Sequence, residues 1–322
     1  MSEITAIVFN SIFPVFFIIG LGFYLFKTGF IGKELQLGLN KLAYWFGLPA
    51  FLFYKICFAR LEGQTAGKIL ICIVCGTLVC MAAGYISARL FKAPKSSAGA
   101  SLQASGRGNL AFIALPIIFV VVKQMDPERS ELIIDSVILS LTPLIILYNL
   151  ICVTFLVSHS TKVSENIKKD IIREIFTNPL ILACGLGLLV NFYGPSVSAD
   201  SAMFRVCHTI GQSAFPMALL GVGSQLAQIS IKGHVKWVVV FSFIKTVVGP
   251  AAGFIFSRAL SLDSTETLAV MILLSSPTAV AAYVLADQLQ CDPDLTASTI
   301  MLSTVFSFFT FSFILIFFSG VI

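Results

Sequence analysis

The chain has 322 residues, of which 57% are hydrophobic and 11% charged, and its mean hydropathy is +0.95. Soluble globular chains have roughly a quarter of their residues charged, so a water-soluble protein with one large core is excluded and lipid must cover much of the surface. The formal net charge is +5, and such an excess in a membrane protein sets topology and meets anionic head groups. No basic cluster with interleaved aromatic residues indicates a nucleic-acid partner.

Ten stretches are long and apolar enough to cross a bilayer as helices, which requires roughly 20 residues each. They cover residues 4–26, 35–57, 66–91, 98–122, 131–157, 174–193, 202–227, 235–260, 265–288 and 296–320. The sequence therefore predicts an all-α integral membrane protein of ten transmembrane helices. With the N-terminus outside, cytosolic loops carry eleven Lys and Arg against seven in outer loops, so both termini are expected to be non-cytosolic.

Prolines inside these stretches indicate an internal repeat. A proline in a helix interior costs about 3 kcal/mol, so its recurrence is informative. The pairs, about half the chain apart, are Pro14 with Pro179, Pro49 with Pro216, and Pro116 with Pro277. Two five-helix halves must have opposite orientations because five is odd, which is the inverted repeat of secondary transporters. The predicted division is 1–157 and 174–322, joined by a polar cytosolic linker at 158–173.

The fourth and ninth helices are predicted to be broken near mid-membrane. Glycine and polar residues at 105–109 precede Pro116 in the fourth, and small residues surround Pro277 in the ninth. Unwound backbone at this depth is tolerated only against protein or a water-filled cavity. The N-termini of the half-helices would offer donors and partial positive charge to a carboxylate, and the freed carbonyls could hold a cation.

The predicted substrate-binding residues lie at these breaks and on the two helices expected beside them. They are Arg107, Asn109, Pro116, Ser276, Pro277, Thr278, Tyr283, Asn40 and Gln212. For Arg107 the alternative is snorkelling to the cytosolic rim, and for Asn40 and Gln212 it is hydrogen bonding between helices. Lys245, near the middle of the eighth helix, either pairs inside the protein or contacts substrate.

No catalytic residue, metal site or cofactor is predicted. Cys72 and Cys75 have the spacing of half a zinc site, but no second pair or histidine accompanies them, so they are interpreted as apolar packing residues. No acidic residue lies deep in a span, which favours an anion site over a cation exchanger. Coupling to Na⁺ or H⁺ stays open, since carbonyls and hydroxyls can bind sodium without a carboxylate.

Three motifs carry a resemblance to a known family. They are LNKLAYWFGLPAFLF at 39–53, GNLAFIALP at 108–116 and PTAVAAYVLADQL at 277–289. The chain resembles the auxin efflux carrier family along nearly its whole length, as a bacterial-type member within the bile acid/sodium symporter-like superfamily. In that family an Asn often stands two or three residues before the Tyr-Val-Leu-Ala run. Val280 and Ala281 occupy those positions here, which leaves Thr278 or Ser276 as the polar partner.

The resemblance implies a ten-helix inverted repeat in which helices 4 and 9 cross at their broken centres, lined by the second and seventh helices. It also implies a homodimer in a bacterial inner membrane. Plant members export auxin, and bacterial relatives are associated with malonate, malate and similar carboxylates. The short central loop lacks the long insertion of many plant members.

The predicted function is a carrier that moves a small organic anion, a mono- or dicarboxylate or an auxin-like acid, by alternating access. The alternatives are a transporter-like sensor of the same ligands and a sodium-coupled symporter of neutral or sterol-like substrates. A channel would not need two broken helices at a central site. An enzyme is not expected, because His208 and Ser213 are five residues apart and do not share a helix face.

Overall fold

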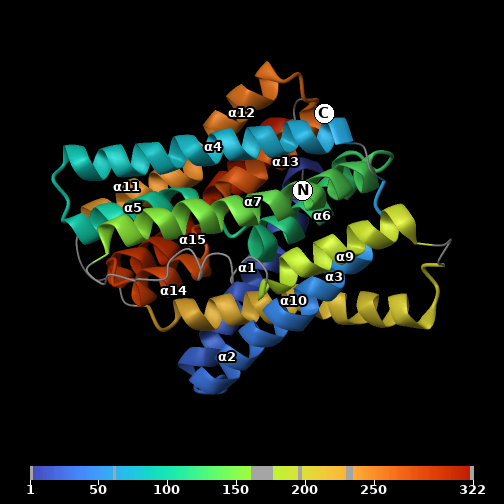
Figure 1. Cartoon of the computed structure of the whole chain (residues 1–322), viewed down its shortest axis with the longest axis horizontal. Helices are drawn as coiled ribbons and strands as arrows, with labels where there is room; N and C mark the ends of the chain where they lie inside the picture. Colours follow the sequence, from blue (N-terminus) through green and yellow to red (C-terminus); the bar gives the residue numbers. More distant parts are fainter. Residues whose placement is uncertain (1–2, 61–62, 161–176, 195–197, 230–234, 320–322) are drawn as a thin grey trace.

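The computed structural model describes residues 3–60, 63–160, 177–194, 198–229 and 235–319, and these ranges are helical apart from short connections. Figure 1 shows α4 and α7 running lengthwise through the bundle, with α3, α9 and α10 packed together along one flank. In chain order the helices are α1 (Glu3–Lys27), α2 (Lys33–Leu42), α3 (Leu48–Cys57), α4 (Gly63–Leu90), α5 (Lys95–Gly106), α6 (Leu115–Met125), α7 (Ser130–His159), α9 (Pro179–Tyr193), α10 (Ala202–Leu226), α11 (Val235–Phe243), α12 (Gly249–Ala259), α13 (Ser264–Ser275), α14 (Val280–Gln288) and α15 (Pro293–Ser319).

Several of these helices can cross a membrane by length and composition. The long apolar segments are Val8–Lys27, Gly63–Leu90, Ser130–His159, Val235–Ala259 and Pro293–Ser319, and shorter apolar helices are Leu110–Met125, Pro179–Tyr193 and Ser264–Ser275. Phe9, Phe13 and Phe17 lie exposed on α1, as expected for a surface that lipid covers. The prediction of an all-α membrane protein is therefore confirmed.

Proline explains three local changes of helix geometry. The π-helical turns η1 (Ala43–Gly47), η2 (Leu110–Ala114) and η3 (Ile244–Val248) are each followed, two residues later, by a proline in the next helix. These are Pro49, Pro116 and Pro250. A proline ring lacks a donor and clashes with the carbonyl of the preceding turn, and the wider π turn relieves that clash. The chain thus passes each proline without leaving the helix.

Two helical segments are fully interrupted, and the interruptions cross. After α5 the backbone is extended at Arg107, and after α13 it is extended at Ser276, which precedes a proline. The Asn109 N–H donates to the Pro277 carbonyl at 2.7 Å, and the Ala279 N–H donates to the Arg107 carbonyl at 2.8 Å. These two bonds form an isolated antiparallel bridge and satisfy backbone groups that have no helical partner.

Two of the half-helices that end at the crossing are buried on every side. All residues of α5 from Ser97 to Gly106, and all residues of α13 from Thr265 to Ser275, are buried. The α5 sequence, KSSAGASLQASG, consists mostly of small residues, which allow neighbouring backbones to approach closely. The broken ends of α5 and α13 therefore lie inside protein, where irregular backbone is tolerated.

The boundaries differ most from the predicted spans at the fourth and the sixth. The fourth span was expected at 98–122, whereas α5 and α6 together extend from Lys95 to Met125. The sixth was expected to begin at 174, but α9 begins at Pro179, because the Asn178 side chain caps it by accepting the N–H groups of Leu180 (3.0 Å) and Ile181 (3.4 Å). Residues 161–176, and with them most of the predicted linker, lie outside the described residues.

The crossing makes Gly108 intolerant of a side chain. A Cβ atom there would lie 2.5 Å from Ser276 Oγ and 3.2 Å from Lys245 Cε. We expect Gly108→Val to lower the stability of the purified protein by about 1–3 kcal/mol, because overpacking forces the crossing apart. The matched control is Gly185→Val, since a Cβ atom at Gly185 has no neighbour within 4 Å. Thermal unfolding in detergent measures both, and equal melting temperatures for the two variants would contradict the tight crossing.

Candidate functional site

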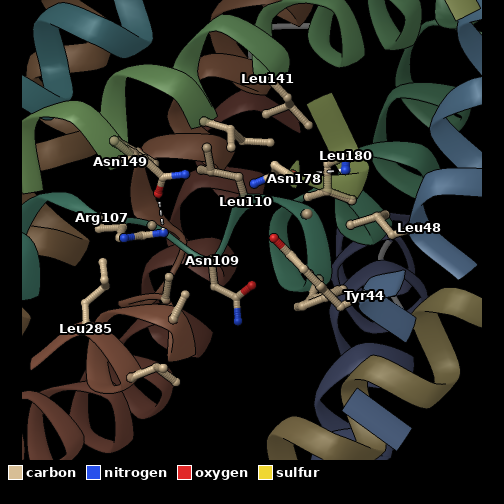
Figure 2. Close-up of a pocket in the computed structure, with 18 of the residues that line it drawn as sticks. Tyr44, Leu48, Arg107, Asn109, Leu110, Leu141, Asn149, Asn178, Leu180 and Leu285 are labelled. Atoms are coloured by element: carbon tan, nitrogen blue, oxygen red, sulfur yellow. Dashed lines mark hydrogen bonds between the residues drawn. The ribbon is translucent and has the colours of Figure 1, made fainter. Parts of the chain in front are cut away.

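A cavity of about 470 Å³ lies beside the crossing, between α7, α14 and the start of α9 (Figure 2). Its lining combines the extended residues at the α5 break with residues from the later part of α7. The lining residues are Tyr44, Leu48, Arg107, Gly108, Asn109, Leu110, Ala111, Phe112, Leu141, Ile145, Tyr148, Asn149, Asn178, Leu180, Ala279, Ala281, Val284, Leu285 and Gln288. The two interruptions thus contribute backbone and side chains to one space.

Arg107 is a charged group in the cavity wall and is only partly satisfied. Its Nη2 donates to Asn149 Oδ1 on α7 at 3.0 Å, and Figure 2 shows this bond at the edge of the cavity. Its Nη1 is buried and has no hydrogen-bond partner within the described part of the chain. Among the same residues, no carboxylate forms a salt bridge with Arg107. A guanidinium with an unused donor is well suited to bind an anion.

Asn109 lies next to Arg107 in the cavity. Its residue is 5% exposed, and within the described ranges its carboxamide makes no hydrogen bond, although its backbone N–H is bound to Pro277. Figure 2 shows the Asn109 side chain between Arg107 and Tyr44, with its polar end in the open space. The carboxamide is open to the cavity, so a ligand or water there can complete its bonding.

Two further polar groups come from elements distant in the sequence. Asn178 uses its Oδ1 to cap α9, which leaves its amide nitrogen turned toward the cavity in Figure 2. The Tyr44 hydroxyl, carried by η1, also points into the cavity in that view. The remaining wall is largely apolar, with residues such as Leu141, Leu180 and Leu285. Within the described part of the chain, the cavity lining therefore has one cationic group and several polar groups at one end and apolar surface around the rest.

The structure places two of the predicted site residues, Arg107 and Asn109, in this cavity. Ser276, Pro277 and Thr278 lie at the crossing but not in the cavity wall. Ser276 Oγ donates to the Leu273 carbonyl at 2.7 Å, and Thr278 Oγ1 donates to the Ala104 carbonyl at 2.6 Å. Their polar groups hold the interrupted backbone rather than facing the open space.

The other predicted residues lie elsewhere. Pro116 is buried in α6, and Tyr283 is half-buried on α14 against the core. Asn40 on α2 packs against Gly221 of α10, since its Oδ1 is 1.9 Å from where a Cβ of Gly221 would be. Gln212 is exposed and pairs with His208, with 3.3 Å between their Nε2 atoms. The Gln212–His208 pair lies along one helix, and Asn40 contacts a neighbouring helix by close packing, so neither side chain lines the cavity.

Sequence reasoning did not find Tyr44, Tyr148, Asn149, Asn178 and Gln288 as lining residues. Two signals were present. Tyr148 and Asn149 are adjacent polar residues inside an otherwise apolar span, and Asn178-Pro179 is a helix-start pair. What the sequence does not contain is the distance between these elements and the break at Arg107.

Ion pairs link neighbouring segments at the end of α7 away from the cavity. Arg129, which precedes α7, pairs with Asp263 and, at 3.1 Å, with Glu266 at the start of α13. The hydrogen bond to Asp263 raises the pKa of the Arg129 guanidinium above its ordinary value. Lys55 pairs with Glu131 at 2.8 Å at the same end of α7. The cavity, by contrast, is lined by the middle of α7, from Leu141 to Asn149, and by one side of α14 as far as Gln288.

A family model described as a membrane transport protein matches residues 7–315. The chain belongs to this family. The match confirms the resemblance to auxin efflux carriers, and it places the protein in a family of membrane transporters. An uncharacterized transporter of Methanocaldococcus jannaschii is 20% identical over 301 residues, covering 91% of this chain and 93% of the relative. An uncharacterized transporter of Methanothermobacter thermautotrophicus is 22% identical over 300 residues, covering 92% and 94%.

The ion pairs of Arg129 are expected to stabilise the folded protein modestly. We predict that Arg129→Gln lowers stability by about 1 kcal/mol, because partly exposed pairs contribute little each. The loss should shrink when salt is raised from about 0.05 to 1 M, since screening weakens the wild-type pairs. Arg205→Gln is the control, because its 3.7 Å pair with Asp200 is largely exposed. Thermal unfolding at both salt concentrations tests this, and an equal loss at Arg205 would contradict it.

Proposed function

We propose that this transporter carries a small organic anion, whose carboxylate binds between Arg107 and Asn109. The observation that supports this most directly is the buried, unpaired Nη1 of Arg107 beside a carboxamide that has no partner within the described ranges. An anion would satisfy both groups at once, and charge-assisted hydrogen bonds are roughly twice as strong as neutral ones. The start of η2 is nearby, and its backbone N–H groups carry a partial positive charge that would also attract an anion.

The composition of the cavity favours one carboxylate with an apolar body. Among the described residues, Arg107 is the cationic residue in the lining, and none of the lining residues is acidic. A second carboxylate on the ligand would have to leave water and face residues such as Leu141, Ile145 or Leu285, and burying an unpaired charge is costly. An alkyl or aromatic body would instead gain from burial against the same residues. The proposed substrate is therefore a monocarboxylate.

We further propose alternating access between two inverted halves, 1–157 and 174–322, in a ten-helix arrangement. The interruptions at Gly108 and Thr278 fall in the fourth and ninth predicted spans, at comparable places in the two halves. Related halves can exchange conformations and expose a central site to either side. With both termini non-cytosolic, the cavity would face the cytosol, and the ion pairs of Arg129 would close the outer side.

The direct test is a thermal-shift screen of the purified protein against monocarboxylates, dicarboxylates and indole acids, with and without sodium. A ligand at about 100 times its Kd should stabilise the protein by about 2.7 kcal/mol. A saturable shift followed by uptake into liposomes supports a carrier. A shift without flux would instead favour a sensor, and no shift with any anion would remove the anion assignment.

Within a series of monocarboxylates, affinity should rise by about fourfold for each added methylene until the cavity is full, because each buried CH₂ contributes about 0.8 kcal/mol. A dicarboxylate of the same length should bind at least about tenfold more weakly. Competition against a monocarboxylate that shifts the protein measures both trends. Tighter binding of the dicarboxylate would show that a second cationic group reaches the ligand, contrary to the lining described here.

Replacing either polar group should weaken this binding. Asn109→Ala and Arg107→Gln are each expected to raise the Kd by about 10- to 100-fold, because a hydrogen bond to a charged group contributes about 1.5–3 kcal/mol. Gln212→Ala is the matched control, since Gln212 is exposed and lies outside the cavity. Melting curves without ligand confirm that the variants fold. An unchanged affinity in Asn109→Ala would remove Asn109 from the site.

A further inference from the structure

Lys245 is a lysine buried in the middle of a membrane-spanning segment. It lies in η3, between α11 and α12, and is 1% exposed. Among the described residues no carboxylate forms an ion pair with it. A buried ammonium without a counter-ion is expensive, so its retention at this place requires an explanation.

The ammonium contacts the end of a half-helix. Lys245 Nζ donates to the Leu274 carbonyl at 2.6 Å, and Leu274 is the residue before the last of α13. The final carbonyls of a helix have no partner inside it and carry the negative end of its dipole. The positive charge of Lys245 therefore faces the partial negative charge that the interruption of α13 exposes.

The side chain also reaches the other interrupted segment. The Cε atom of Lys245 would be 3.2 Å from a Cβ placed on Gly108, the residue that forms the bridge with Thr278. Lys245 thus lies against both strands of the crossing. The π turn fixes it there, with Thr246 Oγ1 donating to the Ser242 carbonyl at 2.8 Å and Cys80 Sγ donating to the Ile244 carbonyl at 3.6 Å.

We propose that Lys245 is the resident cation of the crossing, so that this carrier binds its anion without Na⁺. The proposal rests on the proposed function above. In sodium-coupled carriers with broken helices, unwound carbonyls and half-helix C-termini coordinate the metal ion. Here the Lys245 ammonium is hydrogen-bonded to the Leu274 carbonyl. The ammonium would repel a second cation at that carbonyl, because like charges repel strongly at short range in a low-dielectric interior.

The role proposed for Lys245 is to position the crossing and not to touch the substrate. By neutralising the C-terminal end of α13, it stabilises the arrangement in which Asn109 and Arg107 face the cavity. A lysine that merely packs would be replaceable by an uncharged side chain without any sensitivity to cations. A resident cation, once removed, leaves a site that a small external cation can fill.

The experiment compares purified wild type, Lys245→Ala and Lys245→Met in sodium chloride, choline chloride and ethylammonium chloride. The melting temperature of the wild type should be the same in sodium and in choline. Its Kd for the anion should agree between the two salts to within about twofold. Lys245→Ala should melt lower in choline, and Na⁺ or ethylammonium should raise its melting temperature saturably, since either cation can bind at the freed carbonyls. Lys245→Met keeps an apolar side chain without the charge. It should also melt lower than wild type, and Na⁺ or ethylammonium should raise its melting temperature less than that of Lys245→Ala.

The control is Lys236→Ala, because Lys236 lies over the Phe91 ring at 4.4 Å near the start of the same segment and should show no cation dependence. A Na⁺ requirement for anion binding by wild type would overturn the proposal, as would a Lys245→Ala melting temperature that is the same in all three salts. If Lys245→Ala does not fold, the proposal is tested by the sodium dependence of anion binding in wild type and by the melting temperatures of Lys245→Met in the three salts.

Failure of the proposed function is distinguishable from failure of this inference. If no anion shifts wild type in any salt, the anion assignment fails. The cation-dependent melting of Lys245→Ala, which needs no anion, would still decide the role of Lys245.

Discussion

Two backbone hydrogen bonds at the crossing are the constraint on which the rest of the structure depends. A helix that stops inside a membrane leaves donors and acceptors that lipid cannot satisfy. Here the Asn109 N–H and the Ala279 N–H find carbonyls on the opposite interrupted segment. Each interruption is therefore the partner of the other, and neither is stable alone. The burial of α5 and α13 on all sides follows, because exposed broken ends would have no such partner.

Small residues are what allow this pairing. Gly108 has no room for a Cβ, because Ser276 Oγ and Lys245 Cε occupy the place where it would lie. The Ser and Thr hydroxyls around the crossing donate hydrogen bonds to nearby backbone carbonyls, as Thr278 does to Ala104. Ser303 completes the set by accepting the Thr278 N–H at 3.0 Å. Close approach and local bonding together make a polar centre that is rigid in a largely apolar protein.

The sequence was informative wherever covalent structure dictates geometry. Prolines and glycines marked both interruptions, and apolar length marked the spans, because these follow from local rules. The lining was not predictable in the same way. Asn149 and Asn178 reach the cavity only because α7 and α9 pack beside the break, which is a tertiary relation. Asn40 and Gln212 are polar residues in spans like Asn109, but Asn40 packs against Gly221 and Gln212 pairs with His208, and no local pattern separates them from Asn109.

The two cationic residues near the crossing, Lys245 and Arg107, have different partners, and this difference suits them to different roles. Lys245 is bound to a helix-end carbonyl and is enclosed by protein. Arg107 is bound through one nitrogen to Asn149 and keeps another without a partner within the described ranges. A guanidinium has five donors in a planar fork, so it can hold a neighbour and a ligand together, whereas an ammonium is a compact charge suited to a single carbonyl end. Under the proposals above, Lys245 would stabilise the backbone at the crossing, Arg107 would remain available for an anion, and the anion would not have to displace a structural contact when it binds.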